Sequence, residues 1–515
     1  MPDSITPVAL EWALTHITKY NDTDIFPRAF EFEAIRANWP AIRDYLSAQE
    51  FAEYKPETAF RILVPKAALG FRVAVQPGPL ESILYAASVY EMANAIENHR
   101  VGASLNIACS FRVDLKADGS FFGESDGAAD YHVRSKQLAS SGKFSHVLIA
   151  DIADFYNQIY THRVQSALEA AGVDKERAKN FEDFILKQSA KQSRGIPVGP
   201  YASNLIAEGC MDDVDKHLMA KGLTHTRYVD DFRIFARSRR EAIFALYDLT
   251  DYLYTAHRLT LQLSKTRIIP VDEFVGEELD DPTEQEERSK KSRIDALLKE
   301  LQETIGYGAD VKELDNQELN KVVRENITVL FEECVQSEHL PQHLARYLLR
   351  RAGRLRARAL YGKVFDNLEK LVPVFRDVTA YIKTTNSPEH VASWGAKLLE
   401  FLNGSDLGSL PFVRMWALDL LENIPTLTTP EAAFKLAVDS EKTLGLRHTA
   451  LIAKTHNMMD WVREHKETWR NHGPRDRRAL IWAATALPPT ERGYWLDLVK
   501  EGGDLLDVTV AHLAG

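Results

Sequence analysis

The stretch RYVDDFRIF, residues 227–235, sets two adjacent carboxylates, Asp230 and Asp231, between two apolar runs that favour β-strands. With THTRYV before the pair and FRIFA after it, the pattern predicts a β-hairpin with the aspartates at its centre. Each carboxylate raises the free-energy cost of ionising the other. Because an Asp-Asp pair also occurs in ordinary solvated turns, the surrounding sequence decides whether this pair carries chemistry.

A third aspartate ends a separate strand-like segment, SHVLIAD, residues 145–151. If this strand lies beside the hairpin in one sheet, Asp151 converges with Asp230 and Asp231, and such a cluster is unfavourable unless a cation fills it. Oxygen-only ligands suit Mg²⁺, which completes its coordination with water and phosphate oxygens. Two such ions can activate an attacking hydroxyl and stabilise a departing oxygen in phosphoryl transfer. The sequence therefore predicts a divalent-metal site.

Further segments surround the three aspartates in a fixed order. DIADFYNQIY (151–160) places two aromatic residues after Asp151, GIPVGPYASNLIAE (195–208) is a glycine- and proline-rich turn that runs into a helix, and LQLSKTRII (261–269) follows the hairpin. Nearer the N-terminus, RILVPK (61–66) and FRVAVQ (71–76) predict another hairpin, and apolar spacing predicts a helix over residues 80–97.

In this order and spacing the segments resemble the palm of reverse transcriptases: the first aspartate motif, the glycine-rich motif, the YxDD hairpin and the lysine motif. The hairpin at 61–76 is similar to the fingers of the same family, so the resemblance covers roughly residues 60–270. It implies an RNA-directed DNA polymerase, a nucleotidyltransferase that uses dNTPs and a nucleic-acid strand.

The resemblance also implies the metal ligands. Asp151 and Asp230 match the main ligands of two Mg²⁺ ions, for which Mn²⁺ is a possible substitute, and Asp231 matches an auxiliary carboxylate. Because consecutive strand side chains point to opposite faces, we expect Asp230 and Asp231 to differ unless the turn re-aims one of them.

Three residues match positions that bind the incoming nucleotide. Tyr156 matches the steric gate that blocks a ribose 2′-hydroxyl, which predicts deoxynucleotide use, whereas Phe155 is interpreted as a core aromatic. Lys66 and Arg72 match the cations that grip the triphosphate through charge-assisted hydrogen bonds. The alternatives are a second core aromatic at Tyr156 and solvated hairpin charges at Lys66 and Arg72.

Three more residues match the nucleotide, template and proton-donor positions. Gly199 would let the backbone approach nucleotide or template closely, and Ser203 matches the serine of the family. Lys265 matches a lysine that can donate a proton to departing pyrophosphate. An ordinary helix-entry turn at Gly199 and Ser203, and a surface lysine at a strand end, are the alternatives.

Departures from the common pattern indicate a subgroup. Val198 stands where most template-copying members carry a glutamine that contacts the nucleotide, and no ribonuclease H domain, endonuclease signature or zinc-finger cysteines are found. The opening at 13–35, the GIPVG variant and the helical tail resemble the prokaryotic defence-associated (abortive-infection, AbiK-like) reverse transcriptases. That resemblance implies antiphage defence, homo-oligomeric rings such as trimers or hexamers, and protein-primed DNA synthesis, sometimes without a template.

The second half of the chain is predicted to be all-helical, with helices at 314–335, 340–352, 364–379 and 390–402. We predict an α+β class: a reverse-transcriptase fingers–palm domain over 1–275, a polar linker or loop over 276–293, and a helical-repeat (HEAT-like) domain over 294–515. An irregular helical bundle is the structural alternative to stacked repeats.

The net charge of −11 over 515 residues means that nucleic acid must be bound by a local basic surface. The stretch RYLLRRAGRLRARALYGK, residues 346–363, is the main candidate, and pairing of its arginines with the acidic linker is the alternative. RDRRALIW, residues 475–482, is a second candidate. Trp461 and Trp482 lie in helical patterns that are more typical of a core than of base-stacking surfaces.

Composition limits the remaining possibilities. No apolar run reaches the length of about 18 residues that a membrane span needs, and the first residues lack a signal-peptide pattern, which predicts a cytoplasmic protein without membrane contact. Three scattered cysteines are predicted to be core residues. Two other functions stay open: a conventional RNA-templated reverse transcriptase of the retron or group II intron kind, and a helical scaffold with a vestigial palm.

Overall fold

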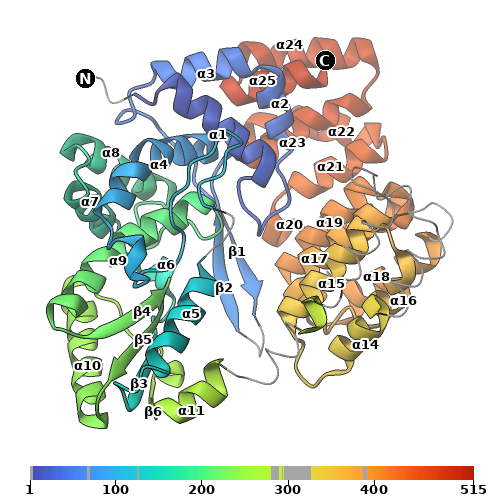
Figure 1. Cartoon of the computed structure of the whole chain (residues 1–515). Helices are drawn as coiled ribbons and strands as arrows, with labels where there is room; N and C mark the ends of the chain where they lie inside the picture. The colour runs from blue at the N-terminus through green and yellow to red at the C-terminus, as the bar shows by residue number, and fades with distance from the viewer. Residues whose placement is uncertain are drawn as a thin grey trace, which may run out of the picture. The chain divides into compact units, whose positions relative to one another are not determined.

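The computed structural model describes residues 4–66, 70–123, 127–279, 289–292, 294, 326–386 and 391–515 (Figure 1). Contacts divide the chain into two compact units. The first comprises Met1–Phe32, Asn38–Arg61 and Val73–Asp281, and the second comprises Glu33–Ala37, Ile62–Arg72 and Pro282–Gly515. Most of the predicted linker, 276–293, lies outside the described residues, and the predicted domain limits stay a prediction.

The first unit begins with helices that surround one central helix. Thr6 caps α1 (Pro7–Tyr20) by accepting the N–H of Ala9, and Pro7 supplies the fixed φ that favours a first helical position. The predicted helix at 80–97 is confirmed as α4 (Pro79–His99). It is apolar on most of its faces because it packs between α1 and α9 (Tyr201–Ala220).

The predicted hairpin at 61–76 is confirmed by a two-stranded sheet of β1 (Phe60–Pro65) and β2 (Phe71–Gln76). Its closing backbone hydrogen bond runs from the Lys66 N–H to the Gly70 carbonyl, 2.7 Å.

An antiparallel sheet of four strands forms the centre of the first unit, with strand order β4-β5-β3-β6 (Figure 1). Val147 joins an apolar cluster with Leu138 and Phe274 on one face. Leu148 and Ile234 are paired in register, point to the other face and are fully buried, so the sheet is covered on both faces. The strands are β3 (His146–Asp151), β4 (Thr224–Tyr228), β5 (Asp231–Ala236) and β6 (Arg267–Pro270).

Short connecting helices complete this unit, and α10 packs against β3 and β5. Its remaining helices are α2 (Glu31–Ala37, shared with the second unit), α3 (Trp39–Ala48), η1 (Ala103–Leu105), α5 (Ala128–Ala139), α6 (Phe155–Gln158), α7 (Thr161–Ala170), α8 (Lys175–Gln188), α10 (Arg239–Tyr252), η2 (Leu253–His257), η3 (Leu263–Lys265), α11 (Val271–Phe274) and η4 (Val275–Leu279).

From residue 326 on, every regular element among the described residues of the second unit is a helix. Helices two apart in the chain pack against each other: α15 on α17, α17 on α19, α19 on α21, α21 on α23 and α23 on α25. Stacked helix pairs produce this order, and a HEAT-like repeat stays a prediction. The helices are α14 (Thr328–Gln336), α15 (Gln342–Arg354), α16 (Tyr361–Asp366), α17 (Phe375–Thr385), α18 (Val391–Gly404), α19 (Pro411–Asn423), α20 (Pro430–Leu444), α21 (Arg447–Thr455), α22 (Met459–Lys466), α23 (Pro474–Ala483), α24 (Pro489–Gly502) and α25 (Leu505–Ala514).

One predicted helix is wrong in its continuity. The apolar spacing over residues 364–379 predicts a single helix, but α16 ends at Asp366 and α17 begins at Phe375, with the short helix η8 (Val372–Val374) between them. Asn367 leaves the helical conformation with a φ of −130°, and Pro373, which has no N–H to donate, prevents a continuous hydrogen-bond ladder further on. The helices expected at 340–352 and 390–402 are confirmed, and residues 314–325 of the first expected helix lie outside the described part.

Part of the arginine-rich stretch is engaged within the helical unit. Arg350 Nε contacts Asp377 of α17 at 2.8 Å, Arg346 Nε lies 3.5 Å from the same carboxylate, and Arg358 Nε donates to the Thr385 carbonyl at 2.8 Å. Arg346 and Arg350 therefore pair with Asp377, and because most of the predicted linker lies outside the described residues, its pairing with these arginines stays a prediction.

Other expectations have mixed outcomes. All three cysteines are buried, as predicted. Trp461 and Trp482 are only partly buried; Trp461 stacks on His465, and Lys454 lies over the ring of Trp482. Among the described helices, none is both long and apolar enough to cross a bilayer.

Candidate active site

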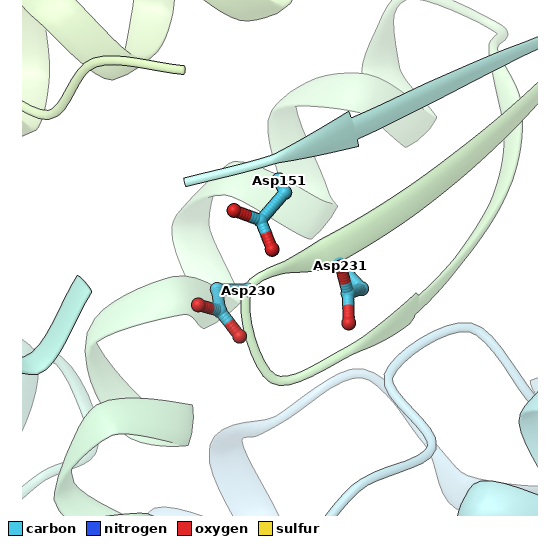
Figure 2. A group of neighbouring side chains, drawn as sticks. All are labelled: Asp151, Asp230 and Asp231. Atoms are coloured by element: carbon cyan, nitrogen blue, oxygen red, sulfur yellow. The ribbon is translucent and has the colours of Figure 1, made fainter. Parts of the chain in front are cut away.

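The three aspartates expected to converge do converge. Asp151 ends β3 and is the register partner of Asp231, the first residue of β5. Side chains directly opposite each other in antiparallel strands share a face. One ligand oxygen from each of Asp151, Asp230 and Asp231 lies within 4.8 Å of the others (Figure 2). This confirms the predicted neighbourhood of strand and hairpin.

The turn of the β4–β5 hairpin brings Asp230 into the cluster. Val229, between Tyr228 and Asp230, has a φ of +56°, a left-handed conformation that is strained for a β-branched residue. This turn changes the direction of the Asp230 side chain, so that the carboxylates of Asp230 and Asp231 both lie beside Asp151. In a regular strand, two consecutive side chains would point to opposite faces.

Burial and like charge perturb one of these carboxyl groups strongly. Asp151 is buried, and Asp230 and Asp231 are more exposed. Burial raises the pKa of Asp231 to about 7, with further contributions from the charge of Asp230 and from Asp151. A hard cation would remove this repulsion, and three carboxylates are the donor set that Mg²⁺ and Mn²⁺ accept. The residues therefore fit a divalent ion.

Lys265 lies beside the cluster. Its Nζ contacts Asp151 Oδ2 at 2.8 Å, and its side chain is 62% exposed. The segment that carries it is fixed to the end of β3, because the Gln262 N–H donates to the Asp151 carbonyl at 2.7 Å. Partial burial lowers the pKa of Lys265, but the hydrogen bond and the charge of Asp151 outweigh it, so the pKa lies above its ordinary value.

Tyr156 is anchored near this end of the sheet. Its hydroxyl donates to Asn204 Oδ1 at 2.8 Å, and its ring packs edge-on against Phe155. Phe155 is buried, as expected for a core aromatic, whereas Tyr156 is partly exposed. The role of Tyr156 as a steric gate stays a prediction.

Gly199 and Ser203 are engaged inside the protein. Gly199 has a φ of +135°, and a Cβ there would lie 2.3 Å from Thr23 Oγ1, so packing against Thr23 already accounts for the glycine. Ser203 is buried, and its hydroxyl lies 3.0 Å from the Tyr85 hydroxyl. Their roles toward nucleotide or template stay predictions.

Lys66 and Arg72 flank the tip of the β1–β2 hairpin, and both are exposed. They belong to the segment Ile62–Arg72, which groups with the second unit. Their place relative to the aspartates stays a prediction.

Sequence reasoning missed a buried charge network behind the hairpin. Arg227, fully buried on β4, contacts Asp215 at 2.6 Å and Glu208 at 3.0 Å, both from α9. Arg227 Nη1 also donates to the Val229 carbonyl at 2.7 Å. Burial alone would raise the pKa of Asp215, but the charge of Arg227 and hydrogen bonds from His225 and Arg227 hold it below its ordinary value.

The other side of the Val229 peptide is held as well. The Val229 N–H donates to Ser110 Oγ at 2.8 Å, and the Ser110 hydroxyl donates to Glu208 at 2.5 Å. Glu208 also accepts from the buried Arg100 at 2.6 Å. The strained residue before Asp230 is therefore fixed at both its N–H and its carbonyl. The sequence gives only a weak signal for this network: Arg227 stands three residues before Asp230 in a strand, THTRY, that is mostly polar but largely buried.

One comparison with known protein families finds a match over the part of the chain that carries this site. Residues 106–291 match the family model for reverse transcriptase (RNA-dependent DNA polymerase). This part of the chain is a reverse transcriptase domain, which indicates an RNA-directed DNA polymerase, a nucleotidyltransferase. No curated protein matches the chain.

Two similar solved structures are telomerases. One, from Candida albicans in complex with a TWJ fragment of telomeric RNA, is 10% identical over 74% of this chain and 70% of that chain, with a TM-score of 0.33. The other, apo telomerase from Candida tropicalis, is 11% identical over 84% of this chain and 72% of that chain, with a TM-score of 0.32. Scores this low carry no argument about this chain.

Proposed function

We propose that the chain is a divalent-metal-dependent DNA polymerase of the reverse transcriptase type, which adds deoxynucleotides from dNTPs to a growing strand. The observation that carries this proposal is the cluster of Asp151, Asp230 and Asp231, with one oxygen of each inside 4.8 Å. Divalent ions held there supply the charge that lets a hydroxyl attack the α-phosphate of a nucleotide as pyrophosphate leaves.

The chain's own groups have distinct roles in this proposal. Asp151, Asp230 and Asp231 hold the ions. Lys265, whose pKa lies above its ordinary value, is protonated at neutral pH and can give its proton to the departing pyrophosphate. Tyr156, whose hydroxyl is tied to Asn204, blocks a ribose 2′-hydroxyl.

The remaining predicted contacts concern the nucleotide and template. Lys66 and Arg72 bind the triphosphate of the incoming dNTP through charge-assisted hydrogen bonds. Gly199 and Ser203 support the turn and helix start on which nucleotide or template lies, Ser203 from its buried position beside Tyr85.

We further propose that this polymerase acts in antiphage defence of the abortive-infection type. The opening at 13–35, Val198 in place of a glutamine and the helical second half support this assignment. It implies priming from a Tyr or Ser hydroxyl of the protein, a covalent DNA product, synthesis without a template, and a homo-oligomeric ring.

The site is tested by Asp230→Ala combined with Asp231→Ala. We expect dNTP incorporation in Mg²⁺ to fall below detection while the folded state persists, because the variant relieves the repulsion within the cluster and neither aspartate is fully buried. A matched control is Asp272→Ala combined with Glu273→Ala, which removes two adjacent exposed acids in the first turn of α11. Undiminished incorporation by the first variant would refute the site.

The mode of synthesis is tested with wild-type protein freed of nucleic acid and supplied with dNTPs alone. Product that stays attached to denatured protein supports self-priming, and mass spectrometry then locates the modified residue. Strict dependence on an RNA template and annealed primer would instead establish the conventional RNA-templated enzyme. Inactivity under both conditions would favour a scaffold with a vestigial palm.

A further inference from the structure

An open cavity of about 360 Å³ lies in the first unit, apart from the three aspartates. Its walls come from α1, from the loop 111–123 and from the first residue of α9. Six of the lining side chains are aromatic rings, namely His16, Tyr20, Phe111, Phe121, Phe122 and Tyr201. Such a lining is suited to a flat, unsaturated ligand.

The loop is fixed to α1 by contacts that need no ligand. The Trp12 indole donates to the Lys116 carbonyl at 2.8 Å, and His16 Nδ1 lies 2.7 Å from the Gly119 carbonyl. Gly119 has a φ of +86°, and a Cβ there would lie 2.5 Å from the backbone nitrogen of His16. The cavity is therefore preformed, which lowers the entropy that a ligand loses on binding.

The cavity is joined to the catalytic hairpin through two consecutive residues. Ser110 accepts the Val229 N–H at 2.8 Å, and Phe111 follows it with a strained φ of +50°. Arg100 fixes the Phe111 carbonyl at 3.0 Å, and the Phe111 ring lies 6.4 Å from that of Tyr228. Strained non-glycine residues cluster at functional sites, and this one presents its ring to the cavity.

Charge at the cavity indicates the ligand class. Burial lowers the pKa of His16 to about 4, so the inner wall carries no charge at neutral pH. At the outer edge each exposed lysine is paired with a carboxylate: Lys116 with Asp114 at 3.3 Å, and Lys19 with Asp118, which also lines the cavity. A neutral aromatic interior with balanced charge at its mouth matches an uncharged nucleobase that is bound by stacking, while its phosphate stays in solvent.

We propose that this cavity binds an unpaired nucleobase of the strand on which the polymerase acts, stacked against Tyr20 and Phe111. The inference rests on the proposed polymerase function and adds a second contact for the same strand. Stacking on aromatic side chains tolerates all four bases, so the site selects unpaired strands and not a sequence.

The test uses full-length protein and a set of single-stranded oligothymidylates, each with one 2-aminopurine at a different position. In Mg²⁺-free buffer, at least one position is quenched on binding, because stacking quenches this fluorophore. Tyr20→Leu should remove that quench and weaken affinity by about tenfold. Phe111→Leu should do the same, and Tyr247→Leu, which removes a 69% exposed ring on α10, should do neither.

Two outcomes overturn the inference: an equal quench for wild type and Tyr20→Leu in folded protein, or loss of the quench in Tyr247→Leu alone. The Asp230→Ala, Asp231→Ala variant separates the two proposals. If the cavity binds a base, this variant keeps the quench although it makes no product. If the variant still incorporates dNTPs, the proposed active site fails while the fluorescence result on the cavity stands.

Discussion

At the scale of single residues, the left-handed conformation of Val229 turns the chain so that Asp230 and Asp231 both lie beside Asp151. A β-branched residue at φ +56° costs about 1–2 kcal/mol relative to a right-handed conformation. Hydrogen bonds to Ser110 and from Arg227 hold the peptide in place. The buried charges behind the hairpin therefore have a positional role, because they keep Asp230 beside Asp151.

We predict that Ser110→Ala lowers the rate of dNTP incorporation by about 10- to 100-fold, because small displacements of catalytic groups have effects of this size. The Mg²⁺ concentration for half-maximal rate should rise, since Asp230 would be misaligned. Unfolding free energy should fall by about 1–3 kcal/mol, because the Val229 N–H and Glu208 each lose a buried partner. Mg²⁺ titrations of initial rate and denaturant melts measure both effects.

Ser88→Ala is the matched control for this variant. Ser88 is also buried, but its hydroxyl donates only to the Leu84 carbonyl within α4, at 2.7 Å. It should lose a little stability and keep the wild-type Mg²⁺ requirement. An unchanged Mg²⁺ requirement in Ser110→Ala would mean that the network is structural and does not position Asp230.

We predict a pH dependence that belongs to Asp231. Its pKa is raised from 3.8 in the unfolded chain to about 7 in the folded protein without metal. Between these values the folded state holds a proton that the unfolded state has released, so stability falls as pH rises across this window. Asp231→Asn lacks this titration.

Thermal melts in EDTA at several pH values, from about 5 to about 8, test the prediction. The melting temperature of Asp231→Asn relative to wild type should increase up to about pH 7 and then level off. Mg²⁺ should stabilise wild type more at the upper end, where Asp231 is ionised without a competing proton. A constant difference between the two proteins across the series would contradict the raised pKa.

The sequence predicted that the three aspartates lie together, and the structure also places Lys265 beside them. Both follow from the order of the motifs along the chain, which fixes which strand ends are neighbours. Arg227 and Ser110 could not be predicted, since their role depends on Glu208 and on contacts between segments about a hundred residues apart. Gly199 was recognised as special, but its neighbour Thr23 was not foreseen. Such close approaches exist only in three dimensions.

At the scale of elements, the turn before α9 depends on a contact with the segment after α1. A Cβ at Gly199 would lie 2.3 Å from Thr23 Oγ1 and 3.1 Å from Thr23 Cβ, and its φ of +135° is unfavourable for other residues. We predict that Gly199→Ala lowers the unfolding free energy by about 2–4 kcal/mol, the sum of backbone strain and steric overlap. Denaturant unfolding measures the loss.

Gly172→Ala separates the two contributions to that loss. Gly172 has a φ of +86°, and a Cβ there would meet no atom within 4 Å. It should lose only about 1 kcal/mol, the backbone part. Equal losses for the two variants would show that the contact with Thr23 yields easily and does not fix the turn.

Elements were predicted best where one pattern extends over the whole segment. The strand at 145–151 and the helix at 80–97 were found almost to their ends, because the first has an unbroken apolar run at residues 147–150 and the second is long. The helix expected at 364–379 failed because its apolar spacing continues through Pro373, although the backbone cannot. The spacing of apolar residues indicates which side chains face a core. It does not show where the backbone hydrogen bonds of a helix are interrupted.

At the scale of the whole molecule, a net charge of −11 opposes nucleic acid, so binding has to be local. In the arginine-rich stretch, Arg346 and Arg350 already contact Asp377. Arg354 and Arg356, at the end of α15 and just beyond it, are exposed. We expect these two to supply phosphate contacts, and the paired arginines to contribute mainly to the packing of α15 on α17.

We therefore predict that Arg354→Glu combined with Arg356→Glu weakens binding of a single-stranded oligonucleotide and flattens its salt dependence. Losing two phosphate contacts should reduce the slope of log K against log salt by about 1.4. Lys435→Glu combined with Lys442→Glu, on exposed positions of α20, changes the net charge equally. If both variants weaken binding alike without altering the slope, the total charge is responsible and the arginines make no phosphate contact. A reduced slope in the arginine variant alone would place the strand on this end of α15.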